Sequence, residues 1–215
     1  MGLAMSQETG EPDDLLKRVR AGDGDALAEL FDRHRDRLKR MVRLRLDRRL
    51  QGRVDPSDVL QDAYLDVARR AAEYADNPAM PLYLWLRFLT GQRLLMIHRH
   101  HLGTQMRDAG QEVSLHRGAI PQASSASLAA VLLGLHTSPT QAALRAEMQL
   151  RLQEVLNSME HLDREVLVLR HFEELSNNET AEVLGLQKSA ASNRYIRALK
   201  RLKSALASIP GFLDQ

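Results

Sequence analysis

The sequence predicts an all-α protein of two small helical domains joined by a flexible linker, the C-terminal domain being a helix-turn-helix. Apolar residues recur at helical spacing through most of the 215 residues. Between residues 108 and 140 the composition changes to Gly, Ser, Ala and Pro, which favour a linker. Near the C-terminus a helix stop separates two short helical patterns. We therefore expect a tail at 1–12, domains at 13–107 and 141–210, and a linker at 108–140.

Composition narrows the class of protein. The chain has no cysteine, which excludes disulfides and thiolate zinc sites and fits a reducing cytoplasm. No apolar run approaches the length of a membrane span, and residues 1–14 are polar without a signal-peptide core. The net charge is only +2, so the placement of charge is more informative than its sum. We expect a soluble cytoplasmic protein that makes no membrane contact.

The first domain begins with a short helix and a long, strongly basic one. Asp23 or Asp25 can cap the long helix. Its buried stripe follows helical spacing and consists of Leu27, Leu30, Phe31, His34, Leu38, Met41, Val42 and Arg45. Ten lysines and arginines, but only two aspartates, lie between Arg33 and Arg53. A solvated face usually mixes signs, so this run predicts contact with nucleic acid or another polyanion.

The third helix starts at the sequence Asp-Pro-Ser-Asp of residues 55–58, with proline in its first turn and acids where the helix dipole favours them. One of its faces is acidic and contains a single leucine. Such a face suits docking to a basic partner helix, although simple solvation of an amphipathic helix explains it equally well. The residues of this face are Asp58, Gln61, Asp62, Leu65 and Asp66.

A loop at residues 74–81, with two prolines and Asn77, precedes the fourth helix. Trp85 could stack on a base, but it belongs to an apolar series at helical spacing, so we expect it in the core. His98 and His101 lie three residues apart without a grouped carboxylate. A basic, partly exposed helix end is therefore favoured over a metal site, and we expect no metal.

The helix-turn-helix is the most specific motif. Ser176 and Glu179 have the spacing of a capping box, and Gly185 supplies the left-handed stop. The helix starting near Lys188 carries six lysines and arginines and no acid through Lys203, which suits DNA, although a basic solvated face is the simpler alternative. Its predicted DNA-binding residues are Lys188, Ser192, Asn193, Arg194, Ile196, Arg197 and Lys200.

Residues 161–202, HLDREVLVLRHFEELSNNETAEVLGLQKSAASNRYIRALKRL, resemble the promoter-binding domain of bacterial RNA polymerase sigma factors of the extracytoplasmic-function (ECF) type. Upstream, DPSDVLQDAYLDVARR resembles the sigma segment that grips the coiled coil of the largest polymerase subunit. LYLWLRFLTGQRLL then resembles the family's Trp-Leu helix. The matches come in the family's order and cover roughly residues 13–107 and 143–206, so together they are far more specific than one motif.

The resemblance implies roles for these segments. The C-terminal helix would read the minus-35 duplex, and the acidic face would bind core RNA polymerase. The loop and fourth helix would capture a base of the melted minus-10 strand, with Asn77 contacting the base and Arg87, Gln92 and Arg93 lining the strand path. Residues 96–101, MIHRHH, depart from the acid and paired arginines that many members carry, so contacts from those positions are not carried over.

A transcription initiation factor is therefore the favoured function, with core polymerase, promoter DNA and possibly an anti-sigma factor as partners. No nucleophile and base, phosphate loop or metal set occurs in the sequence, so we expect no enzyme activity and no cofactor. One alternative is a helix-turn-helix repressor or activator that acts without polymerase docking. Another is an interaction module whose basic helices contact acidic proteins. The apolar segment Leu128–Leu135 could dock on the chain itself, on polymerase or on an inhibitor.

Overall fold

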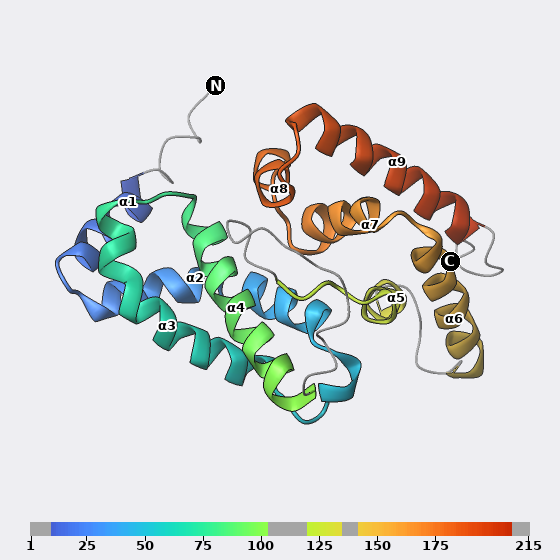
Figure 1. Cartoon of the computed structure of the whole chain (residues 1–215), viewed down its shortest axis with the longest axis horizontal. Helices are drawn as coiled ribbons and strands as arrows, with labels where there is room; N and C mark the ends of the chain where they lie inside the picture. The colour runs from blue at the N-terminus through green and yellow to red at the C-terminus, as the bar shows by residue number, and fades with distance from the viewer. Residues whose placement is uncertain (1–9, 103–119, 135–141, 208–215) are drawn as a thin grey trace, which may run out of the picture. The chain divides into compact units, whose positions relative to one another are not determined.

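The structure is a computed structural model that describes residues 10–102, 120–134 and 142–207. All regular structure in these residues is helical, which confirms the predicted fold class (Figure 1). The chain divides into two compact units. The first comprises residues up to Val42 together with Gly52–Ile120, and the second comprises Arg43–Gln51 and the chain from Pro121 onward.

The first unit contains α1 (Gly10–Arg20), most of α2 (Gly24–Arg45), α3 (Pro56–Asp76) and α4 (Leu82–Leu102). Asp23 is the residue that caps α2, because its carboxylate accepts the backbone N–H groups of Asp25 and Ala26 at 3.0 and 3.1 Å. α3 packs against both α1 and α4 (Figure 1). The helices meet in an apolar core that includes Leu38, Met41, Leu60, Val67 and Leu86.

The second unit begins with the segment Arg43–Gln51, which holds the 3-10 turn η1 (Arg48–Leu50). The remaining elements are α5 (Ser125–Gly134), α6 (Ala142–Ser158), α7 (His161–Leu167), the π-helical turn η3 (Val168–Phe172), α8 (Asn177–Leu184) and α9 (Lys188–Ala207). α9 packs on α6, α7 and α8. One apolar cluster joins α5, α6, α7, η3 and α9, with Leu152, Val168 and Ala198 fully buried in it.

Helix α5 lies in the stretch that the sequence predicted to be a linker. It packs on α6, and its side chains Leu128, Ala129, Leu132 and Leu133 are buried in the cluster of the second unit. Burying this uncharged, strongly apolar helix removes its side chains from water. This stabilises a packed helix even though the surrounding Gly and Ser residues favour a flexible linker. The apolar segment thus docks on its own C-terminal unit; its last residue, Leu135, and positions 103–119 and 135–141 lie outside the described residues.

A buried ionic cluster also lies within the second unit. Arg45 donates through Nε to Glu173 at 2.8 Å, through Nη2 to Glu165, and through Nη1 to the carbonyl oxygen of Pro121 at 2.9 Å. The Arg45 and Glu173 side chains are 1% and 0% exposed. Burial alone would lower the pKa of Arg45, but the two carboxylates raise it above its ordinary value, so the guanidinium stays charged.

Within the part of the chain that the structure describes, no helix is both long enough and apolar enough to cross a membrane.

Candidate nucleic-acid and polymerase interfaces

The turn between α8 and α9 has the predicted geometry. The Ser176 side chain accepts the Glu179 N–H at 3.2 Å, and the Glu179 carboxylate accepts the Ser176 N–H at 2.7 Å, so the capping box is complete. Gly185 ends α8 with φ 61° and ψ 40°, a left-handed conformation that costs glycine least. The Asn177 side chain donates to the Lys188 carbonyl at 2.9 Å and ties the two helices at their starts.

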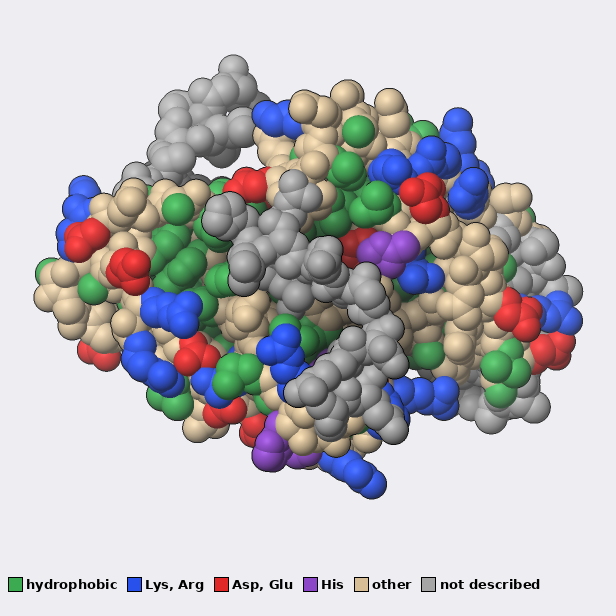
Figure 2. All heavy atoms as spheres, viewed as in Figure 1, with side chains coloured by type: hydrophobic (Ala, Val, Ile, Leu, Met, Phe, Trp, Pro, Cys, Tyr) green, Lys and Arg blue, Asp and Glu red, His purple; other side chains and the backbone are tan. Residues whose placement is uncertain are grey.

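Helix α9 presents one buried and one exposed face. Ala191 and Ala198 are fully buried, and Leu202 is buried in the same cluster as Ala198. Arg170 lies over the Tyr195 ring at 4.9 Å, which adds a cation–π contact between η3 and α9. Lysine and arginine side chains gather over α9 in Figure 2. The exposed residues of this helix include Lys188, Ser189, Asn193, Ile196, Arg197, Lys200, Arg201 and Lys203.

Two of the predicted DNA-binding arginines are held by one buried acid, Asp163 of α7. Arg197 donates through Nε and Nη2 to the two Asp163 carboxylate oxygens at 2.9 and 2.7 Å. Arg194 donates through Nη1 to the same carboxylate at 2.8 Å and pairs with Glu160 at 2.9 Å. The hydrogen bond from Arg197 lowers the pKa of Asp163 below its ordinary value, against the effect of burial, and Arg194 acts in the same direction.

This cluster changes the role expected for the arginines. Arg197 is still half exposed, but the planar N–H fork that would read guanine is occupied by Asp163. Arg194 is only 24% exposed in its side chain. Asp163 was absent from the predicted site because it lies 31 and 34 residues from its partners, and no local spacing reveals such a contact. The sequence offers one indication of this contact: Asp163 is an acid in the helix-turn-helix region, whose last helix has cations and no acid.

The acidic residues lie on α3, which begins at Pro56 as the sequence predicts. Asp55 is the N-cap, accepting the Ser57 N–H at 2.7 Å, and Pro56 occupies the first turn. Asp58, Gln61 and Asp62 are exposed, and Leu65 is 53% exposed beside them. An exposed leucine framed by carboxylates has the features of a docking surface for a basic helix.

A groove borders this acidic face. Its volume is about 580 Å³, and its lining comes from α2 and α3. Phe31 and Tyr64 meet edge to face at its wall, with ring centroids 5.2 Å apart. The lining residues are Ala28, Glu29, Phe31, Asp32, Arg35, Leu60, Gln61 and Tyr64.

Asp66 and Arg93, predicted for different partners, bind one another. Arg93 donates to Asp66 through Nε at 3.0 Å and Nη2 at 2.5 Å, and each side chain is 20% exposed. Arg69 approaches the same carboxylate at 3.2 Å. The ion pair joins α3 to α4. It also uses hydrogen-bonding groups of Asp66 and Arg93 that a polymerase or DNA contact would need.

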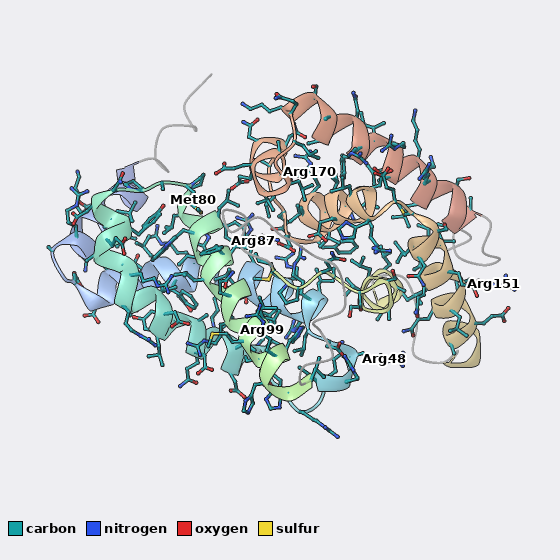
Figure 3. The ribbon with its side chains drawn as sticks, viewed as in Figure 1. Arg48, Met80, Arg87, Arg99, Arg151 and Arg170 are labelled. Atoms are coloured by element: carbon teal, nitrogen blue, oxygen red, sulfur yellow. The ribbon has the colours of Figure 1, made fainter. Side chains whose placement is uncertain are left out.

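The loop between α3 and α4 is held by aromatic residues. Tyr74 stacks on Trp85 with ring centroids 4.3 Å apart, and its hydroxyl donates to the Met80 carbonyl at 2.8 Å. Met80 lies beside the start of α4 (Figure 3). Trp85 is partly buried by this stack, while Asn77, the C-cap of α3, is exposed. The aromatic pair therefore fixes the loop while the Asn77 side chain faces solvent.

Other predicted contact residues differ in exposure. Gln92 is half-buried, whereas Arg87 is only 4% exposed, which does not fit a side chain lining an open strand path. The basic run is likewise not one continuous surface: Arg45 is buried, and Arg37 lies over the Tyr83 ring at 3.6 Å. The helical spacing already places Arg45 on the buried stripe, whereas the position of Arg37 depends on an aromatic partner that is distant in the chain.

The histidine segment is only partly as predicted. His100 and His101 are exposed, but His98 is buried at 3% exposure, so it faces the core and not a surface. Across residues 10–102, 120–134 and 142–207, no group of three or more possible metal ligands occurs.

The regular structure of the described residues is helical, and its helix-turn-helix exposes a helix that has six cationic residues and no acid. This combination is typical of the class of proteins that bind DNA. Residues 149–202 match the family described as Sigma-70, region 4. The chain is also 27% identical over 205 residues to the ECF RNA polymerase sigma factor SigD of Mycobacterium tuberculosis, covering 95% of this chain and 88% of that protein. The chain is thus similar to ECF sigma factors over most of its length, and its C-terminal part matches their region 4.

Two further comparisons agree. The chain is 25% identical over 198 residues to the ECF RNA polymerase sigma factor SigK of a Mycobacterium species, covering 92% of each protein. The solved structure of CnrH, in complex with the cytosolic domain of CnrY, matches with a TM-score of 0.55 and 20% identity, over 93% of this chain and 99% of that one. That structural likeness shows the shared fold.

Proposed function

We propose that this protein is a transcription initiation factor that binds core RNA polymerase and directs it to specific promoters. The observation that carries the proposal is the exposed cationic face of α9, set by a complete capping box and a left-handed glycine stop. The match of residues 149–202 to Sigma-70, region 4 supports duplex reading at the minus-35 element by this face. The cations supply affinity through phosphates, and the polar and apolar side chains contact base edges.

Polymerase docking is proposed for the acidic face of α3. Asp58 and Asp62 would steer a basic helix of the largest-subunit coiled coil, and Leu65 would supply apolar area that becomes buried on docking. Asp66, whose two carboxylate oxygens pair with Arg93 and Arg69, would contribute less than its exposed neighbours. The groove lined in part by Gln61 borders the same surface.

Strand trapping is proposed for the loop between α3 and α4. Asn77 would hydrogen-bond an unstacked base of the minus-10 element, and Gln92 and Arg93 would follow the strand. Because single-stranded DNA binds only after the duplex opens, its binding energy shifts the equilibrium toward the open form. The factor then needs no nucleotide hydrolysis and has no catalytic step of its own. It would act in the cytoplasm, where polymerase works.

A protein inhibitor is a further proposed partner. CnrH, which shares this fold, was solved together with the cytosolic domain of CnrY. An anti-sigma factor that covered the acidic face of α3 would compete directly with polymerase for Asp58 and Asp62.

Reconstituted transcription tests the function. The purified chain should co-purify with bacterial core polymerase and support run-off transcription from a subset of genomic fragments. A repressor or activator that acts without docking would instead bind duplex DNA without polymerase and yield no transcript from the reconstituted pair.

Charge reversal tests the docking face. The double variant Asp58→Lys/Asp62→Lys should weaken polymerase binding on the order of tenfold or more at low salt, because it places like charges against a basic helix. The matched control is Glu147→Lys/Glu154→Lys, which changes net charge equally at exposed positions on α6. Equal affinities for the two variants, measured by fluorescence anisotropy, would remove α3 as the docking helix.

A further inference from the structure

The exposed face of α9 contains more than cations. Ser189, Asn193, Ile196 and Lys200 are separated by four, three and four residues, so they form one stripe along the helix. Ala191, Ala198 and Leu202 form the opposite, buried side. The stripe therefore projects directly away from the core of the second unit.

The arginine chemistry that most often reads guanine is not available on this stripe. A bidentate guanine contact needs the two parallel N–H groups of the guanidinium fork. In Arg197 these two groups, on Nε and Nη2, already donate to the Asp163 carboxylate at 2.9 and 2.7 Å. Arg194 is held by Asp163 and Glu160. Asp163 thereby acts as a positioning residue that directs both arginines away from base edges.

Ile196 has no evident reason to be exposed on a cationic helix. Its side chain is 48% exposed, and a β-branched residue adds nothing to the stability of a solvated helix. Binding an apolar group over the Ile196 side chain would remove its apolar surface from water, which is favourable. In the major groove the apolar group that a base pair presents is the methyl group of thymine.

Asn193 complements this contact. Its side-chain amide carries a donor and an acceptor on one plane, which match N7 and the N6 amino group of adenine. It lies three residues before Ile196, where side chains on the same helix face are about 5–6 Å apart. That separation is suited to neighbouring base pairs, so the two side chains can contact them together.

We propose that Asn193 and Ile196 determine the base specificity of α9, selecting an adenine and a thymine methyl at neighbouring base pairs of the duplex. This inference rests on the proposed function and names what the helix reads. Duplex DNA is the occupant because α9 carries six lysines and arginines and no acid, a charge that complements phosphate. Lys200 and Lys203 would then contact phosphates of the DNA backbone.

The test uses the full chain bound to core polymerase and a promoter library with a randomised upstream element. The enriched duplex is remade with uracil in place of each thymine and with 7-deazaadenine in place of each adenine. Loss of one thymine methyl should weaken binding about fourfold at one position. Loss of one adenine N7 removes one of the two hydrogen bonds and should weaken binding about 2- to 13-fold at a neighbouring position.

Variants assign each effect to a side chain. Ile196→Ala should bind the uracil and thymine duplexes equally and keep its response to 7-deazaadenine. Asn193→Ala should show the reverse pattern. Lys203→Ala is the control, because loss of an exposed backbone contact should weaken all duplexes by the same factor. Circular dichroism checks that each exposed substitution leaves the helices intact.

The outcomes are separable. Base-analogue sensitivities that are unchanged in Ile196→Ala and Asn193→Ala would overturn the inference, as would dependence on guanine N7 at those positions. Either result would leave the initiation function standing. If the complex enriches no upstream element and makes no transcript, both the proposed function and this inference are wrong.

Discussion

At the scale of single residues, buried charge is where this chain is most sensitive. Arg45 is enclosed with Glu165 and Glu173 in the second unit, and the whole cluster depends on one guanidinium. Taking one member from a buried ionic cluster leaves the others charged in a medium that solvates them poorly. The cost of such a change greatly exceeds that of an exposed pair.

The variant Arg45→Met is therefore expected to lower the free energy of unfolding by about 3–5 kcal/mol, measured by urea denaturation followed by circular dichroism. Arg49→Met, which removes an exposed pair with Asp47, should lower the free energy of unfolding far less. The triple variant Arg45→Met/Glu165→Leu/Glu173→Leu should recover most of the loss, since no charge is left buried. Equal stability of the two arginine variants would contradict this account.

Asp163 gives a stability that depends on pH. Its pKa is lowered in the folded chain from an ordinary value of 3.8, so the carboxylate favours folding at pH values above that point. The contribution falls as the pH drops through about 4 toward the lowered pKa, because the carboxyl must then be protonated. Asp163→Asn should be less stable near neutral pH and should show a flatter decline between about pH 5 and 3.

Acid titration of unfolding, followed by circular dichroism, measures this difference. Asp58→Asn is a suitable control because the Asp58 side chain is exposed on α3, far in sequence from the arginines of α9. Its stability profile should parallel that of the unchanged chain. If the profile of Asp163→Asn were also parallel, the hydrogen bonds from Arg194 and Arg197 would contribute nothing to folding.

At the scale of elements, α5 shows how an apolar segment becomes part of a domain. Ten residues without a charge pack on α6 and contribute four buried apolar side chains to the cluster of the second unit. Neighbouring positions provide a direct comparison, because Leu132 is 6% exposed and Val131 is 36% exposed.

Leu132→Ala should destabilise the chain by about 2–5 kcal/mol, because it leaves a cavity between α5 and α6. Val131→Ala removes a smaller, exposed side chain and should change stability by less than about 0.5 kcal/mol. Urea denaturation of both variants measures the difference. Similar midpoints would mean that α5 contributes little to the second unit.

At the scale of the whole molecule, local signals predicted well what local interactions determine. The start of α3 at Pro56, the capping box of Ser176, the stop at Gly185 and the start of α9 at Lys188 all follow from residues within one helical turn. Their physics is short-range, so one stretch of sequence contains both partners. The fold class followed from the same periodicities.

What the sequence did not predict is decided by contacts between distant residues. Asp163 lies 34 residues from Arg197, and Arg45 lies 128 residues from Glu173. The Asp66–Arg93 pair spans 27 residues and joins two side chains that the sequence assigned to different surfaces. A charge count describes how many arginines a segment has, but only the packed chain shows which of them already have an acid.

The cluster around Arg45 also constrains how this chain can evolve. Arg45 lies 120 and 128 residues from Glu165 and Glu173 and is the one cation of this cluster, so replacing it alone leaves two buried carboxylates without a counter-charge. A lineage that loses Arg45 keeps a stable second unit only if both glutamates are also replaced by apolar residues. Related sequences with an apolar residue at position 45 should therefore lack both carboxylates, whereas sequences that keep the arginine need at least one of them.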